Sequence, residues 1–200
     1  QLLESELFDP DLKEFTQIII EQADRLSALV NRLLGPQKMG LRTTHNIHSV
    51  LEKVRKLVCL DIPDFINIKV DYDPSIPDFE MQPDQLLQAF LNIMQNAVQA
   101  LDSHANSHSQ ITLRTRTAHQ VTINGLSHRL AAEIKIIDNG PGIPEELEDT
   151  LFYPMITGRS DGTGLGLSIA QELIKQHNGR IECHSIKGHT EFLIYLPMIV

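Results

Sequence analysis

The chain has 200 residues, of which 42% are hydrophobic and 22% charged, and its formal net charge is −9. This is the composition of a folded globular protein, and the acidic balance excludes a general nucleic-acid coat. No stretch reaches the roughly 20 apolar residues that a membrane-spanning helix needs. Two cysteines, Cys59 and Cys183, are too few for a disulfide framework, so we expect a reducing, cytoplasmic setting. The chain begins with Gln1 rather than Met, and we expect it to be a piece of a longer protein.

The first 36 residues carry a helical pattern of their own. Leu12, Ile19, Leu26 and Leu33 recur every seven residues, which predicts one long helix over 11–34 in a bundle or coiled coil. The segment before it, QLLESEL, resembles the end of another helix. We therefore expect a partial helical hairpin that dimerises, with packing on the chain's own domain as the alternative. Gly35-Pro36 ends the helix and predicts a boundary between residues 1–36 and residues 37–200.

The pattern after the boundary predicts both helices and strands. Apolar residues at helical spacing predict helices over 46–61, 84–102 and 164–177, with a short acidic helix from Pro144. Alternating segments predict strands over 66–72, 111–117, 120–124, 130–138, 180–186 and 190–196. Several of the strands follow one another as hairpins, which favours a mixed sheet covered on one face by helices. The expected class is α+β, a two-layer α/β sandwich.

A glycine-rich turn follows the apolar strand Ile134–Ile137. Its sequence is Asp138-Asn139-Gly140-Pro141-Gly142. Glycines let a flat ligand approach the backbone, and a buried carboxylate accepts a hydrogen bond from an exocyclic amine. Asn-Gly and Pro-Gly are also common turn pairs, so this motif alone indicates a plain turn equally well.

A second glycine group leads directly into a predicted helix. It reads Gly162-Thr163-Gly164-Leu165-Gly166-Leu167. Such a loop presents backbone N–H groups to phosphates at the positive end of a helix. The spacing fits neither a dinucleotide-binding fingerprint nor a Walker A loop. A flexible loop without a ligand is the alternative.

Two asparagines share a face of the helix predicted over 84–102. Asn92 and Asn96 are four residues apart. Amide oxygens suit Mg²⁺, and amide N–H groups suit phosphate oxygens. A helical pair of asparagines is more often solvated surface, so this signal is weak by itself.

The three motifs in this order and spacing resemble the N, G1 and G2 boxes of two-component sensor histidine kinases. Leu151–Met155 resembles their F box, and Gly188–Phe192 followed by Leu196-Pro197 resembles their terminal strand. The resemblance implies the GHKL, or Bergerat, ATP-binding fold that these kinases share with gyrase, the Hsp90 chaperones and mismatch-repair ATPases.

The resemblance also implies roles for individual residues. Asp138 would bind the adenine amino group, within a site formed with Gly140, Gly142, Ile143 and Thr190. Asn96 would hold Mg²⁺, and Asn92 would lie near the phosphates. The ATP lid would comprise Gly162, Thr163, Gly164, Leu165 and Gly166. Arg159 is a candidate phosphate contact, with a plain surface charge as the equal alternative.

Several segments are most similar to the nitrogen-regulation sensor kinases of the NtrB family. They are Asn31–Pro36, Arg114–Ala118, Leu151–Arg159, Gly162–Ala170 and Gln176-His177. Membership implies a cytoplasmic homodimer that exchanges phosphoryl groups with an NtrC-like response regulator under a PII-like signal protein. It implies neither direct nucleic-acid binding nor a membrane contact. None of the nine histidines has the family's phosphoacceptor context, so we expect that histidine outside this chain.

The identity of Asn92 bears on the reaction. The hydrolysing relatives have at this position a glutamate that activates water, and asparagine cannot act as that base. Phosphoryl transfer to a protein is therefore favoured over one alternative, a GHKL-type ATPase or chaperone. The intact Asn96, Asp138 and glycine lid argue against the other alternative, a nucleotide-independent docking module for a PII-like protein. His177 near a helix C-terminus is expected to stabilise the helix dipole when charged.

Overall fold

A computed structural model describes residues 42–103, 108–156 and 164–198 of the chain. These residues fall within one compact unit, Leu41–Val200. The helical hairpin predicted over residues 1–36 lies outside the described residues, so its helices and its dimer contact stay predictions. Within the described ranges, no helix is long and apolar enough to cross a membrane.

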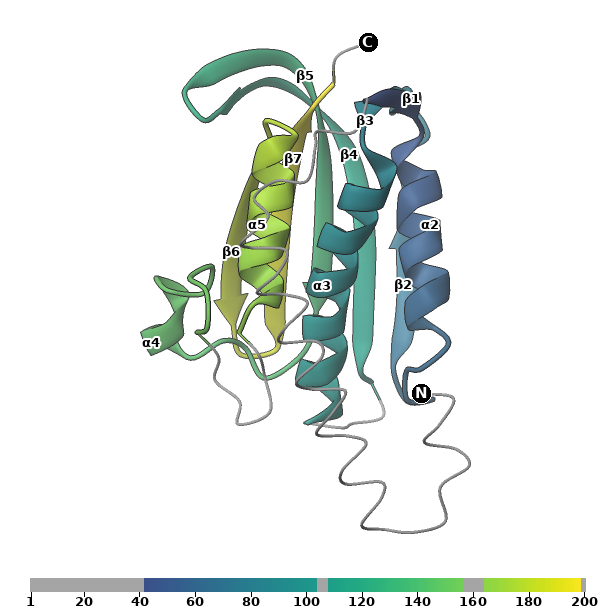
Figure 1. Cartoon of the computed structure of the whole chain (residues 1–200). Coiled ribbons are helices and arrows are strands. Elements are labelled where there is room, and N and C mark those ends of the chain that lie inside the picture. The colour runs from purple at the N-terminus through teal and green to yellow at the C-terminus, as the bar shows by residue number, and fades with distance from the viewer. Residues whose placement is uncertain (1–41, 104–107, 157–163, 199–200) are drawn as a thin grey trace, which may run out of the picture. The chain divides into compact units, whose positions relative to one another are not determined.

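A five-stranded mixed sheet forms one layer of this unit (Figure 1). Its strand order is β2-β4-β5-β7-β6, where β2 pairs with β4 in parallel and the other neighbours are antiparallel. The strands are β2 (Asn67–Asp71), β4 (Gln110–Ile123), β5 (Leu126–Asp138), β6 (Arg180–Ile186) and β7 (His189–Pro197). The predicted mixed sheet is confirmed.

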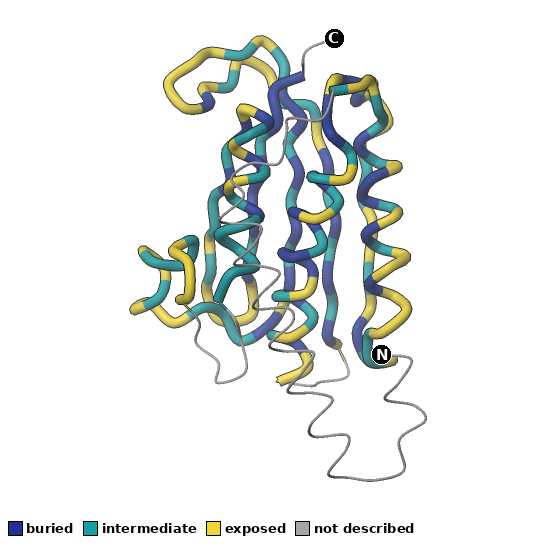
Figure 2. Tube along the Cα trace, viewed as in Figure 1, coloured by how far each residue is buried: buried dark blue, intermediate teal, exposed yellow. Residues whose placement is uncertain are grey.

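Three helices form the second layer, all on the same face of the sheet (Figure 1). They are α2 (Ile47–Val58), α3 (Pro83–Asp102) and α5 (Gly166–Gln176), while the short α4 spans Glu145–Glu148. The apolar stripe predicted on α3 is buried against the sheet, as Figure 2 shows for the helix layer as a whole. Its members are Leu86, Phe90, Ile93, Ala97 and Leu101. The expected two-layer α+β sandwich is therefore confirmed.

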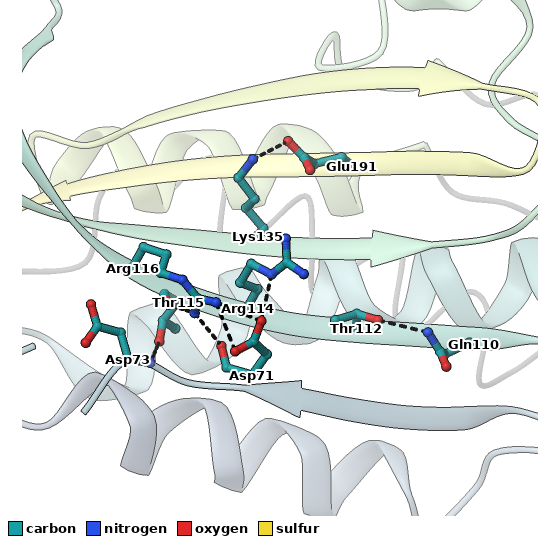
Figure 3. A network of polar contacts seen from close by, with 9 residues as sticks. All are labelled: Asp71, Asp73, Gln110, Thr112, Arg114, Thr115, Arg116, Lys135 and Glu191. Carbon is teal, nitrogen blue, oxygen red and sulfur yellow. Dashed lines mark hydrogen bonds and ion pairs between the residues drawn. The ribbon is translucent and has the colours of Figure 1, made fainter. Parts of the chain in front are cut away.

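The opposite face of the sheet is polar. Figure 3 shows Arg114 and Arg116 reaching Asp71 from the neighbouring strand, with N···O distances of 2.9 Å each. On the same face, Lys135 Nζ lies 2.9 Å from Glu191 Oε1. Side chains alternate between the two faces of a strand, so charged residues on this face leave apolar residues for the helix-covered face. Exposed pairs of this kind contribute little to stability.

The observed strands differ from the sequence prediction at two places, one in the five-stranded sheet and one in a separate two-stranded ribbon. The strands predicted over 111–117 and 120–124 are one strand, β4, in which Gln120 has a φ of +53° without a change of register. The hairpin turn after β4 is Asn124-Gly125, with φ values of +50° and +80°, as a type I′ turn requires. A small ribbon of β1 (Thr43–His45) and β3 (Phe79–Met81) was not predicted, because three residues are too few to show a period.

The contacts of His177 suit a neutral ring, so the interaction expected between its charged form and the helix dipole does not apply here. His177 is buried at the C-terminus of α5, with Nδ1 2.8 Å from the carbonyl oxygen of Leu173. Nε2 accepts a hydrogen bond from the backbone N–H of Gln82, at 3.0 Å, just before α3. Burial lowers the pKa of His177 below 6.5. The neutral ring therefore joins the end of α5 to the start of α3.

Candidate functional site

Three polar side chains form a row across β5, β7 and β6 on the helix-covered face. Asp138 pairs with Thr190, and Thr190 pairs with Ser185. Directly paired residues present their side chains to the same face of a sheet. The next row towards the middle of the sheet consists of Ile136, Phe192 and Cys183. The polar row thus marks the end of an otherwise apolar surface.

Asp138 is a buried acid that forms no ion pair with the described part of the chain. Its side chain is 3% exposed, and Oδ1 accepts a hydrogen bond of 2.9 Å from the N–H of Gly140. Burial raises the pKa of Asp138 to about 6, although the hydrogen bond from the Gly140 N–H and the charge interaction with His189 oppose this shift. Among the described residues, Oδ2 has no hydrogen-bond partner. The carboxyl group is therefore suited to accept a bond from a ligand donor.

The loop after Asp138 lies against the turn between β6 and β7. Gly188 N–H donates to the carbonyl of Gly140 at 2.9 Å, and Ile143 N–H donates to Ser185 Oγ at 2.8 Å. A Cβ on Gly140 would lie 2.7 Å from Asp138 Oδ1 and 3.5 Å from the Cβ of Ala100. Glycine therefore lets the loop lie directly beside the Asp138 carboxylate and α3, where a side chain would collide with the carboxylate.

Asn92 connects α3 to the beginning of α5. Its Nδ2 donates to the carbonyl oxygen of Gly166 at 3.0 Å, and its Oδ1 accepts from Gln88 Nε2 at 2.9 Å. Asn92 is 8% exposed, and a Cβ on Gly166 would lie 3.8 Å from the Cβ of Asn92. The amide is therefore held in one orientation at the start of α5.

Asn96 lies one helical turn beyond Asn92 on α3. Its Nδ2 is buried and has no hydrogen-bond partner among the described residues. Leaving such a group unpaired costs about 1–3 kcal/mol, so a ligand or water at this point would stabilise the structure. Rotation of the side-chain amide exchanges its nitrogen and oxygen, and the oxygen suits Mg²⁺.

A metal ion in this site would need ligands from elsewhere as well. The described residues contain no group of three His, Cys, Asp or Glu side chains that could hold a metal. Mg²⁺ in nucleotide sites takes most of its ligands from phosphates and water, with only one or two from protein. A single amide oxygen from Asn96 fits that pattern.

The segment resembling the F box is bonded to the glycine that precedes α5. Met155 N–H donates to the carbonyl of Gly164 at 2.9 Å. Gly164 has a φ of +64°, and a Cβ there would lie 2.6 Å from the backbone of Met155. Leu165 and Gly166 follow directly as the entry to α5. The other predicted loop residues, Arg159, Gly162 and Thr163, lie outside the described residues.

The sequence placed Asp138, Ile143 and Thr190 in one site through the family resemblance, and the structure has them at the same end of the sheet. Ser185 and Gln88 were not predicted. Ser185 bonds to both Ile143 and Thr190. Its position follows from the register of the β6–β7 hairpin, whose turn at Lys187-Gly188 was a usable signal. Gln88 lies one turn before Asn92, a spacing that predicts a side-chain contact.

Over residues 81–199 the chain matches the family described as histidine kinase-, DNA gyrase B-, and HSP90-like ATPase, and it belongs to this family. It is 61% identical over 199 residues to the sensory histidine kinase/phosphatase NtrB of Vibrio alginolyticus, covering 100% of this chain and 56% of that protein. It is 57% identical over 198 residues to the protein of the same name from Klebsiella oxytoca, with coverages of 99% and 56%. The chain therefore spans about half the length of these curated relatives.

A solved structure agrees with the fold. The nucleotide-free catalytic domain of histidine kinase ThkA has a TM-score of 0.65 at 24% identity, and the match covers 78% of this chain and 95% of that one. The chain thus contains the ATP-binding catalytic domain of an NtrB-like histidine kinase.

Proposed function

We propose that this chain binds Mg-ATP at the Asp138 end of the sheet and transfers the γ-phosphoryl group to a histidine on another polypeptide segment. The observation that carries the proposal is the buried carboxyl of Asp138, which has one oxygen held by Gly140 and the other without a partner among the described residues. The exocyclic amino group of adenine is a donor that fits this acceptor. Thr190 and Ile143 would complete the adenine site beside Gly140 and Gly142.

The phosphates would lie between α3 and the loop that leads into α5. Asn96 would hold the magnesium ion, which neutralises phosphate charge when bound. Gly162, Thr163, Gly164, Leu165 and Gly166 would cover the phosphates with backbone N–H groups near the helix N-terminus. Arg159 would contact phosphate from the same loop.

The chain's own residues favour transfer over hydrolysis. Asn92 stands beside the start of α5, and its amide is already bonded to Gly166 and Gln88. An amide cannot remove a proton from water. Catalysis would therefore come from positioning the phosphoryl group in line with the acceptor histidine.

The relatives suggest the partners. They are named sensory histidine kinase/phosphatase NtrB, and ThkA has been solved in complex with the response regulator TrrA. We infer that the whole protein acts in the cytoplasm as a homodimer through residues 1–36. Its phosphoryl group would pass to an NtrC-like response regulator, under control of a PII-like protein.

Calorimetric titration with ADP and a non-hydrolysable ATP analogue, with and without Mg²⁺, tests this function. The unchanged chain should bind both, Mg²⁺ should strengthen binding, and Asp138→Asn should remove most of the affinity. Asp61→Asn, at an exposed acid, is the matched control. Absence of binding to the unchanged chain would favour a docking module. Rapid steady-state release of phosphate would favour an ATPase instead.

A further inference from the structure

Ser185 lies in the middle of a chain of hydrogen bonds that runs from Ile143 to Thr190, a residue of the proposed adenine site. Its Oγ lies 2.8 Å from the backbone nitrogen of Ile143 and 3.0 Å from Thr190 Oγ1. Thr190 is 4% exposed and is paired with Asp138 on the other side. The side chains of the polar row, Asp138, Thr190 and Ser185, are therefore direct neighbours across the three strands.

The chemistry of the donors restricts how this chain of bonds can run. The N–H of Ile143 can only donate, so Ser185 Oγ accepts its hydrogen. If Ser185 then donates its own hydrogen to Thr190 Oγ1, the hydroxyl hydrogen of Thr190 remains available to a ligand. In the reverse order Thr190 donates its hydroxyl hydrogen to Ser185 Oγ. Thr190 Oγ1 can then only accept a hydrogen bond from a ligand.

The order in which Ser185 donates to Thr190 gives a hydrogen-bonding pattern complementary to adenine. On its Watson–Crick edge adenine has an amino donor beside a ring nitrogen, N1, which accepts. Guanine has a carbonyl acceptor beside an N–H donor at the same positions. A row with an acceptor at Asp138 and a donor at Thr190 matches adenine at both atoms and opposes guanine at both.

We propose that Ser185 is a positioning residue that directs the hydroxyl hydrogen of Thr190 to N1 of adenine and so contributes to the choice of base. This inference rests on the proposed ATP site. Ser185 would act through Thr190 rather than touch the nucleotide. Its hydrogen bond to Ile143 gives it a second, purely structural role in holding the loop, and the test must separate the two.

The analogue 1-deaza-ADP separates the positioning role of Ser185 from its structural role. In this analogue a C–H group replaces N1 and cannot accept a hydrogen bond. Calorimetry should measure the Kd of ADP and of 1-deaza-ADP for the unchanged chain and for Ser185→Ala. We expect Ser185→Ala to raise the Kd of ADP by a factor that is roughly fivefold larger than the factor for 1-deaza-ADP. This difference corresponds to the loss of one ordinary hydrogen bond. Ser185→Thr keeps the hydroxyl group and should bind ADP as the unchanged chain does.

A matched control is available at another serine–threonine pair, between the turn after β2 and strand β4. Ser75 Oγ lies 3.2 Å from Thr117 Oγ1, away from the polar row. Ser75→Ala should leave the affinities for both nucleotides unchanged. Thr190→Val should reproduce the selective loss of ADP affinity, and combining it with Ser185→Ala should add little, because both remove the same bond.

Equal losses for ADP and 1-deaza-ADP in Ser185→Ala would overturn the proposal, since Ser185 would then only hold the loop. Full additivity with Thr190→Val, or no loss of ADP affinity at all, would overturn it too. Failure of the unchanged chain to bind ADP is a separate result. It would refute the proposed function before any variant is made.

Discussion

Replacing Asp138 by asparagine should change stability and nucleotide binding in opposite directions. Burial raises the pKa of this carboxyl group from 3.8 to about 6. At about 1.4 kcal/mol for each pKa unit, the ionised group costs the fold about 3 kcal/mol. Asparagine has the same shape without the charge, and its Oδ1 can keep the bond to the N–H of Gly140. Asp138→Asn should therefore be more stable by up to about 3 kcal/mol at pH 8.

The pH dependence gives this prediction a definite sign. A raised pKa means that the penalty is absent below pH 3.8, grows as pH rises through the interval to about 6, and is complete above it. The stability advantage of Asp138→Asn should thus fall to about half between pH 8 and pH 5. Urea unfolding followed by circular dichroism at both pH values measures it, with Asp61→Asn as control.

Binding should weaken because of hydrogen-bond geometry. If the asparagine Oδ1 keeps the Gly140 bond, its Nδ2 faces the adenine amino group, and two donors meet. A mismatch of about 2 kcal/mol lowers ADP affinity roughly thirtyfold. A variant that is less stable at both pH values, or that binds ADP as tightly as the unchanged chain, would refute the reasoning about Asp138.

Three further substitutions test the neighbouring geometry. Gly140→Ala should lower ADP affinity at least about tenfold in calorimetry, because the new Cβ would lie 2.7 Å from a carboxylate oxygen. As a control, a Cβ on Gly125 would contact nothing within 4 Å, so Gly125→Ala should lower stability by only about 1 kcal/mol, because of the positive φ. Gln88→Ala should cost about 1 kcal/mol in urea unfolding, because Asn92 Oδ1 loses its donor. Since burial lowers the pKa of His177, the unchanged chain should lose stability relative to His177→Gln as pH falls below 6.5, by the same assay. A constant difference between these two proteins from pH 7.5 to 5.5 would contradict the neutral ring.

The features that follow from local pattern could be predicted from the sequence. The apolar stripe of α3 and the alternation of β5 show directly which residues are buried. Asp138 was found because a strand of apolar residues ends in an acid and a glycine turn. These signals need only one segment of chain at a time, and they gave the sheet, the helix layer and the acid at the strand end.

The features that depend on two distant segments could not be predicted in this way. The partners of Ser185 depend on strand register and on how the loop of Ile143 is folded back. For His177, the position at a helix end indicated only what a charged ring would do, whereas the hydrogen bond from the backbone N–H of Gln82 requires a neutral ring. In both cases the missing information was the identity of a hydrogen-bond partner from elsewhere in the chain.

The positions along α3 indicate how the proposed nucleotide would lie. Ala100 is the α3 residue nearest Gly140, whereas Asn96 carries the unpaired amide nitrogen, and Asn92 reaches the start of α5. These residues follow one another at intervals of four, or about 6 Å along the helix axis. A nucleotide with its base beside Asp138 would therefore place its metal-bound phosphates one turn nearer the N-terminus of α3 and its terminal phosphate beside α5. Each unpaired polar group of the described site would then meet the part of the nucleotide that complements it.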